Sequence, residues 1–150
     1  MEEKIILLVE DNPDDEELTR MALRQRQITD EVVVARDGQE ALDWLLAEGP
    51  HAERNPQRLP LVVLLDINLP RISGLDVLKR IRGHALLKWL PVAILTSSGE
   101  DCDVRTAYAH HANSFIVKPQ DPDEFNETVG RLGLYWLKGN VPPPIPLVGE

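Results

Sequence analysis

The sequence predicts an α/β domain built on a five-stranded parallel sheet with helices on both faces. Five short apolar runs alternate along the chain with five segments whose apolar residues recur at helical spacing. The run at residues 61–65 is apolar at every position, which is typical of a strand buried on both faces of a parallel sheet. This alternation calls for right-handed crossovers and a doubly wound sheet, and 150 residues suit one domain.

The first part of the chain is expected to supply two strands, at residues 5–9 and 32–35, each followed by a helix. Asn12 and Pro13 predict the start of the first helix, because asparagine caps a helix well and proline suits its first position. The inner face of this helix is expected to hold Leu18, Met21, Ala22 and Gln25. The second helix is expected to carry Ala41, Leu42, Leu45 and Leu46 at helical spacing.

The central strand is predicted at residues 61–65, after a long polar loop at residues 48–60 that contains three prolines. The strand ends at Asp66, where a carboxylate would emerge at the edge of the sheet. Pro70 then prevents further strand pairing, and Gly74 allows an unusual turn of the backbone. The helix that follows is marked by Leu75, Leu78 and Ile81.

The last part of the chain is expected to hold strands at residues 91–96 and 114–118, with a helix between them. Asp121 and Pro122 predict the start of a final helix. Its buried stripe is expected to be Phe125, Val129, Leu132 and Trp136, with Leu134, Tyr135 and Leu137 on other faces. We expect a folded domain over residues 1–140 and a proline-rich, extended tail over residues 141–150.

Polar residues stand at four of the expected strand ends. They are Glu10 with Asp11, Asp66, Thr96 and Lys118. In a parallel sheet these ends share one edge, where ligands of open α/β sheets bind. Three neighbouring carboxylates repel one another unless a cation compensates, and Mg²⁺ prefers such oxygen ligands. A carboxylate nucleophile, a metal site, a lysine and a hydroxyl together indicate phosphoryl transfer to a carboxylate.

These residues also carry a resemblance to a known family. The motifs are Glu10-Asp11, Asp66 to Pro70 with Gly74, Thr96-Ser97 and Lys118-Pro119. In this order they resemble the receiver domain of bacterial two-component response regulators, over about residues 4 to 138. The resemblance implies a flavodoxin-like sheet with strand order 2-1-3-4-5. It also implies a single-domain signalling protein that is phosphorylated by a histidine kinase and is not an enzyme acting on other substrates.

The resemblance further assigns roles to individual residues. Asp66 would be the phosphoacceptor and become a 4-aspartylphosphate. The residues expected to hold Mg²⁺ are Glu10, Asp11, Asp66 and Asn68, the last through its backbone carbonyl. Thr96 and Lys118 would contact the phosphoryl group, and Phe115 would join Thr96 in a conformational switch. Because a tight turn would let Lys118 reach back over the site, we also expect a cis peptide bond before Pro119.

Three features resemble, more narrowly, the small response regulators that partner phytochrome-type histidine kinases. They are the long loop at residues 48–60, the apolar last helix and the proline-rich tail without an output domain. We also expect a homodimer that forms through the last helix and the tail. Leu134, Tyr135 and Leu137 exceed what the core requires, and large apolar residues clustered on a surface usually mark a contact.

Composition narrows the remaining possibilities. A net charge of −9 argues against nonspecific binding to nucleic acid, and no apolar run is long enough to cross a membrane. The single cysteine, Cys102, favours a reducing cytoplasm. A flavodoxin-like binding protein would need a phosphate-binding loop where residues 10–15 are acidic, and an aspartyl phosphatase would need an acid where Asn68 stands. A receiver-like scaffold that works without phosphorylation is the third alternative.

Overall fold

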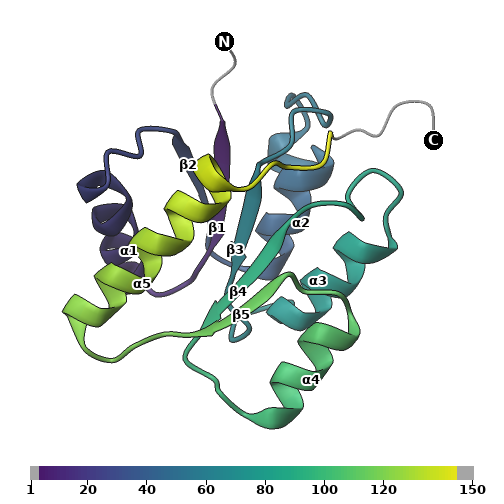
Figure 1. Cartoon of the computed structure of the whole chain (residues 1–150). Helices are drawn as coiled ribbons and strands as arrows, with labels where there is room; N and C mark the ends of the chain where they lie inside the picture. Colours follow the sequence, from purple (N-terminus) through teal and green to yellow (C-terminus); the bar gives the residue numbers. More distant parts are fainter. Residues whose placement is uncertain (1–3, 145–150) are drawn as a thin grey trace.

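The computed structural model, which describes residues 4–144, contains a five-stranded parallel sheet (Figure 1). The strands are β1 (Ile5–Val9), β2 (Glu31–Ala35), β3 (Val62–Leu65), β4 (Val92–Thr96) and β5 (Ser114–Val117). They lie in the order β2-β1-β3-β4-β5 and every pairing is parallel, so the predicted fold is confirmed. All strands begin at one edge of the sheet, which we call the amino edge, and end at the opposite carboxyl edge.

Five α-helices cover the sheet. They are α1 (Pro13–Gln25), α2 (Gly38–Leu46), α3 (Gly74–Gly83), α4 (Asp101–Ala109) and α5 (Pro122–Leu134). Helices α1 and α5 lie side by side on one face, and α2, α3 and α4 lie on the other (Figure 1). The long loop before β3 contains one short 3-10 turn, Gly49–His51. Among the helices between residues 4 and 144, none combines the length and the apolar character that crossing a bilayer requires.

The predicted inner face of helix α1 is confirmed at Ala22 and Leu18 and wrong at Met21 and Gln25. Its buried residues are Thr19, Ala22 and Leu23, and Leu18 is half-buried. Met21 and Gln25, which were expected inside, are exposed. Helix α5 supplies the reason, because a Cβ added to its Gly133 would lie only 2.4 Å from Leu23 Cδ2. The glycine leaves room for Leu23, and this close approach between the helices fixes the rotation of α1.

The end of α5 departs from α-helical geometry. The stripe of Phe125, Val129, Leu132 and Trp136 is buried, as predicted. Residues Tyr135–Gly139 then form a π-helical turn, after which the N–H of Asn140 donates to Tyr135 O at 2.6 Å. A π turn is wider than an α turn and rotates the residues that follow it. Leu137 is consequently buried, which corrects the prediction that it lies on another face, whereas Leu134 and Tyr135 are exposed.

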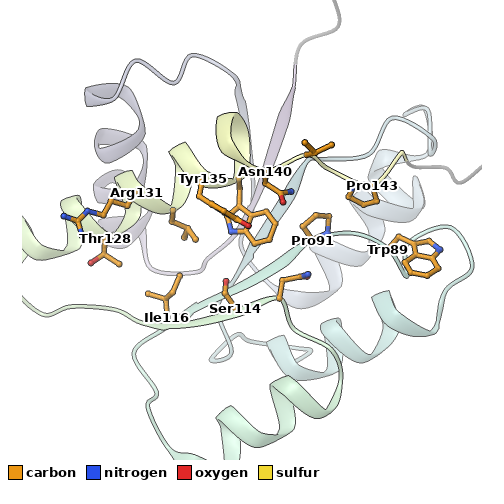
Figure 2. Close-up of a pocket in the computed structure, with 13 residues that line it drawn as sticks. Trp89, Pro91, Ser114, Ile116, Thr128, Arg131, Tyr135, Asn140 and Pro143 are labelled. Carbon is orange, nitrogen blue, oxygen red and sulfur yellow. The ribbon is translucent and has the colours of Figure 1, made fainter.

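Aromatic side chains gather at the amino edge. Helices that connect parallel strands run back across the sheet, so they end where the strands begin. Trp44 accordingly lies near the end of α2, Trp89 lies just before β4, and Trp136 lies in the π turn after α5. Trp89 and Trp136 also line a groove of about 730 Å³, together with Tyr135 and residues of β5 (Figure 2).

The guanidinium of Arg82, in α3, holds the loops of the amino edge together. It donates to the carbonyl oxygens of Lys88, Leu90 and His111 at 2.7–3.2 Å and to Asn113 Oδ1 at 2.9 Å. These bonds use all five N–H groups of the side chain. One arginine therefore ties the end of α3 to the connections that precede β4 and β5.

Candidate functional site

Acidic side chains from two neighbouring strands converge at the carboxyl edge. Glu10 and Asp11 follow β1, and Asp66 follows β3. One carboxylate oxygen of each lies within 4.8 Å of the other two. Glu10 and Asp66 are buried, with 2% and 5% of their surface exposed, whereas Asp11 is exposed. The structure therefore brings the three predicted acids to one place.

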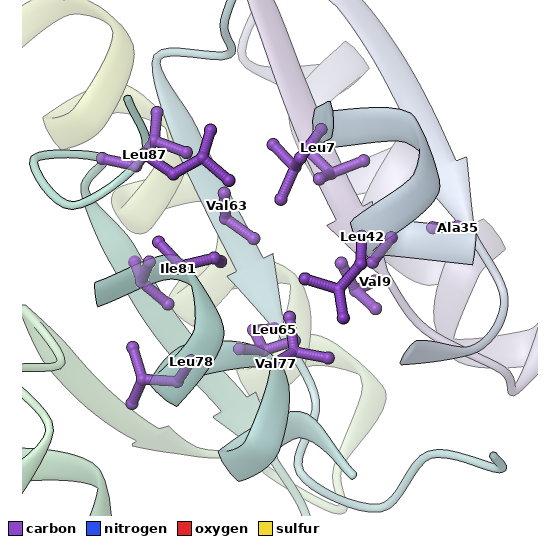
Figure 3. Packing of buried hydrophobic residues seen from close by; sticks show 14 of the residues in the cluster. Leu7, Val9, Ala35, Leu42, Val63, Leu65, Val77, Leu78, Ile81 and Leu87 are labelled. Carbon is purple, nitrogen blue, oxygen red and sulfur yellow. The ribbon is translucent and has the colours of Figure 1, made fainter. Parts of the chain in front are cut away.

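The backbone that carries Asp66 is held from two sides. Val9 and Leu65, the last residues of β1 and β3, are buried in the core beneath α2 and α3 (Figure 3). Beyond Asp66, the chain passes against the start of α3, where the N–H of Gly74 donates to Ile67 O at 2.9 Å. A Cβ added to Gly74 would lie 1.9 Å from Asp66 O, so only glycine fits this approach.

The carboxylate of Asp66 accepts hydrogen bonds on both of its oxygens. The Thr96 hydroxyl and the Asn68 N–H donate to Oδ1, at 2.7 and 3.1 Å. The Lys118 ammonium donates to Oδ2 at 2.8 Å. These donors come from the ends of β4 and β5 and from the loop after β3, so the polar residues predicted at the strand ends do meet around Asp66.

Lys118 is the cationic centre of the site, and its side chain is only 8% exposed. Its ammonium donates to Glu10 Oε1 at 2.6 Å, to Asp15 Oδ2 at 2.8 Å and to Asp66 Oδ2 at 2.8 Å. The backbone N–H of Lys118 donates to the carbonyl oxygen of Thr96 at 2.7 Å, which fixes where the side chain starts. Burial lowers the pKa of Lys118, but hydrogen bonds to the three carboxylates together outweigh burial and raise this pKa above its ordinary value.

Glu10 is the acid whose protonation the site changes most clearly. Burial raises the pKa of Glu10 to about 7, and the neighbouring Asp66 raises it too, although the contact with Lys118 acts in the opposite direction. The other oxygen of Glu10 accepts the N–H of Asn12 at 3.2 Å. Near neutral pH this buried carboxyl is therefore balanced between its acid and its anion.

The acidic group fits a divalent cation. Glu10, Asp11 and Asp66 offer three oxygens to one point, and hard cations such as Mg²⁺ take carboxylate ligands of this kind. A cation would also favour the ionised form of Glu10 and so oppose the burial that raises its pKa. Asn68 contributes a backbone N–H to Asp66, and its predicted role as a carbonyl ligand stays a prediction.

The sequence did not reveal that Asp15 belongs to the site. An acid in the first turn of a helix is ordinarily explained by the helix dipole, yet Asp15 contacts Lys118 directly. Its only signal in the sequence is its position, four residues after Asp11 on a helix that starts at this edge. Phe115 lies half-buried on β5, against the core beneath α2, α3 and α4. The cis bond expected before Pro119 stays a prediction.

Comparison with known proteins agrees with this geometry. The sequence model of the protein family described as the response regulator receiver domain matches residues 6–130 of this chain. The probable methanogenesis regulatory protein FilR2 of Methanothrix harundinacea is 40% identical over 140 residues, which cover 93% of this chain and 87% of that protein. The response regulator Rcp1 of Synechocystis is 35% identical over 135 residues, which cover 90% of each protein.

Solved structures give the same result. The Mn²⁺-bound form of Rcp1 superposes with a TM-score of 0.87 at 33% identity, over 93% of this chain and 99% of that one. The phosphorylated cyanobacterial phytochrome response regulator RcpA gives 0.88 at 35% identity, over 95% and 99%. The bacteriophytochrome response regulator AtBRR gives 0.73 at 47% identity, over 91% and 96%. With its fold, its strand-end acids and these relatives, the chain belongs to the response regulator receiver domain family.

Proposed function

We propose that this receiver domain signals by accepting a phosphoryl group on Asp66 from a histidine kinase, with Mg²⁺ held by Glu10, Asp11 and Asp66. The observation that carries the proposal is the arrangement around Asp66. Its carboxylate is buried at the carboxyl edge, with Thr96 and Lys118 donating to opposite oxygens and two further acids close by. A carboxylate placed in this way is a nucleophile for phosphoryl transfer.

The protein's own residues divide the chemistry between them. A carboxylate oxygen of Asp66 attacks the phosphorus of a kinase phosphohistidine; the P–O bond forms, the P–N bond breaks, and the imidazole leaves. Bound Mg²⁺ would supply charge neutralisation for the phosphoryl oxygens. Lys118 and Thr96 donate hydrogen bonds from fixed positions at the ends of β5 and β4, which lowers the cost of orienting the transferred group.

The test is acetyl phosphate treatment with Mg²⁺, followed by Phos-tag electrophoresis. We expect a retarded, acid-labile species with the wild-type protein and none with Asp66→Asn, which keeps the size of the side chain but removes the nucleophile. Asp76→Asn is the matched control, because Asp76 is an exposed acid on α3 outside the site. Labelling of Asp66→Asn at the wild-type rate would favour a different acceptor, and no labelling of any variant would favour the scaffold alternative.

The switch is proposed to link Asp66 to the surface through Thr96 and Phe115. A phosphoryl group would draw the Thr96 hydroxyl toward its own oxygens, and Phe115 would move into the space released. Phe115 has no hydroxyl, so burying it leaves no polar group without a partner. Side-chain NMR with and without beryllofluoride should report two Phe115 environments, and a single unchanged rotamer would contradict this mechanism.

The kinase is proposed to be of the phytochrome type. Several similar structures are described as phytochrome or bacteriophytochrome response regulators, with identities of 35–47% to this chain. A pull-down with purified histidine kinase domains tests which kinases bind the chain, and a phosphotransfer assay then compares their rates. Phosphotransfer from a phytochrome-type kinase should be faster than transfer from an unrelated kinase of the same organism.

The dimer is proposed to form through the end of α5 and the tail. Tyr135 and Val141 expose 56% and 89% of their surface, and both line the groove at the amino edge (Figure 2). Pro143 lines it too, so the described part of the tail, up to residue 144, runs along the groove. The apolar tail residues Ile145, Leu147 and Val148 lie outside the described residues.

Light scattering of the full chain against a chain ending at Gly139 tests the dimer. We expect a dimer for the full chain at tens of micromolar and a monomer for the shortened one. Domain boundaries at residues 140 and 141 predict that the shortened chain keeps its thermal stability. A full-length monomer, or a shortened chain that dimerises equally well, would contradict the role of the tail.

A further inference from the structure

The resting position of Lys118 depends on a residue that the proposed reaction does not use. An ammonium has three N–H donors, and that of Lys118 donates one hydrogen bond each to Glu10, Asp15 and Asp66, all within 2.8 Å. Of these three acceptors, Asp66 is the proposed nucleophile, and Glu10 and Asp66 both belong to the metal-binding group. Asp15 has a different place, in the first turn of α1.

The contact of Asp15 with the site runs through Lys118 alone. Among the described residues, the carboxylates that converge within 4.8 Å of one another are Glu10, Asp11 and Asp66, and Asp15 is not one of them. It is therefore not placed to complete the metal site. Its carboxylate instead forms a charge-assisted hydrogen bond with the ammonium, which is about twice as strong as a bond between neutral groups.

Phosphorylation requires Lys118 to give up one of these acceptors. A phosphoryl oxygen can receive an N–H of Lys118 only if an existing partner is released. Before the transfer, when Asp66 is still a carboxylate, the side chains of Glu10 and Asp66 are 3% and 5% exposed, so releasing either would leave a buried carboxylate without its cation. The side chain of Asp15 is 25% exposed, so water can replace Lys118 there. Asp15 is thus the partner that can be released at the lowest cost.

We infer that Asp15 is a positioning residue that holds Lys118 in its unphosphorylated arrangement and thereby slows phosphorylation of Asp66. The inference rests on the proposed function of Asp66. Two effects act in the same direction. The Asp15–Lys118 bond must break before Lys118 can turn fully to the phosphoryl group, and the negative charge of Asp15 opposes an approaching phosphate. Removing that charge while keeping the shape should therefore speed phosphorylation.

The variant is Asp15→Asn, and Asp14→Asn is its matched control. Both acids lie in the first turn of α1, where a negative charge interacts favourably with the helix dipole. Of the two, only Asp15 contacts Lys118. Both substitutions change the net charge by the same amount. With acetyl phosphate at saturating Mg²⁺, we expect Asp15→Asn to be phosphorylated about three- to tenfold faster than Asp14→Asn, the range set by one net hydrogen bond.

A second measurement needs neither metal nor phosphate. In the metal-free protein, ¹⁵N NMR of the Lys118 ammonium reports how fast its protons exchange with water. Exchange should be faster in Asp15→Asn than in Asp14→Asn, because one of the three protecting contacts is weakened. A role limited to fold stability would leave this exchange unchanged while lowering the unfolding temperature.

The two failures can be told apart. If the wild-type protein takes up no phosphate, the proposed function is wrong, and the exchange measurement still tests whether Asp15 positions Lys118. If the wild type is phosphorylated and Asp15→Asn reacts no faster than Asp14→Asn, the inference about Asp15 is overturned, whatever the exchange of Lys118.

Discussion

Replacing Gly74 by alanine should damage both the stability of the domain and the placement of its nucleophile. The added Cβ would lie 1.9 Å from Asp66 O and 2.7 Å from Ile67 Cα, where ordinary contacts between such atoms need about 3.5 Å. Both atoms belong to the backbone, so the Asp66 segment must move by about 1 Å or more. Overpacking of this kind costs about 1–3 kcal/mol, and weakening the bond from Gly74 N–H to Ile67 O adds about 1 kcal/mol.

We therefore expect Gly74→Ala to lower the free energy of unfolding by about 2–4 kcal/mol, measured by urea denaturation with circular dichroism. Gly83→Ala is the control in the same helix, since a Cβ there meets no atom within 4 Å. It should leave stability unchanged or raise it by up to about 1 kcal/mol, because alanine favours helix over glycine. The phosphorylation rate should fall in Gly74→Ala alone. Equal stability and equal rates in the two variants would refute the reasoning.

Three further predictions concern charge and hydrogen bonding. The pKa of Glu10 is about 7 in the folded protein and near 4.5 in the unfolded chain, so the folded state binds more protons between these two pH values. The metal-free protein should therefore lose up to about 3 kcal/mol of its free energy of unfolding as the pH rises from 4.5 to 7, measured from urea midpoints. Lys118→Met should cost about 3 kcal/mol at pH 8 and clearly less at pH 5, where Glu10 can be neutral, and an equal loss at both values would contradict the ion pairing. Arg82→Lys should cost about 2 kcal/mol because an ammonium cannot replace five donors, whereas Arg80→Lys, at an exposed position of the same helix, should cost almost nothing.

Much of the fold and of the site follows from local sequence signals. The apolar runs that end in Glu10, Asp66, Thr96 and Lys118 specify parallel strands, and the shared direction of those strands is enough to bring their ends together. No long-range information is needed for this step. The glycine at position 74 was expected to allow a turn, and the structure adds that it also admits the Asp66 carbonyl.

The predictions that failed depend on contacts between segments far apart in the chain or, in one case, on a local change of helix geometry. The rotation of α1 is set by Gly133 of α5, so the sequence of α1 alone could not distinguish Leu23 from Met21 as the buried residue. Leu137 was misplaced because a π turn changes the number of residues per turn, and helical spacing assumes a constant one. Asp15 was missed because a partner 103 residues away gives it its role.

The placement of the three tryptophans has a spectroscopic consequence. Trp44, Trp89 and Trp136 all lie toward the amino edge, at the opposite end of the sheet from Asp66. The emission of Trp89 and Trp136 therefore senses the groove and the start of the tail, and metal or phosphate at the carboxyl edge cannot quench the emission of any of the three by contact. Any change in fluorescence on phosphorylation must then arise from a rearrangement transmitted across the length of the sheet, which makes the native indoles a label-free detector of that transmission.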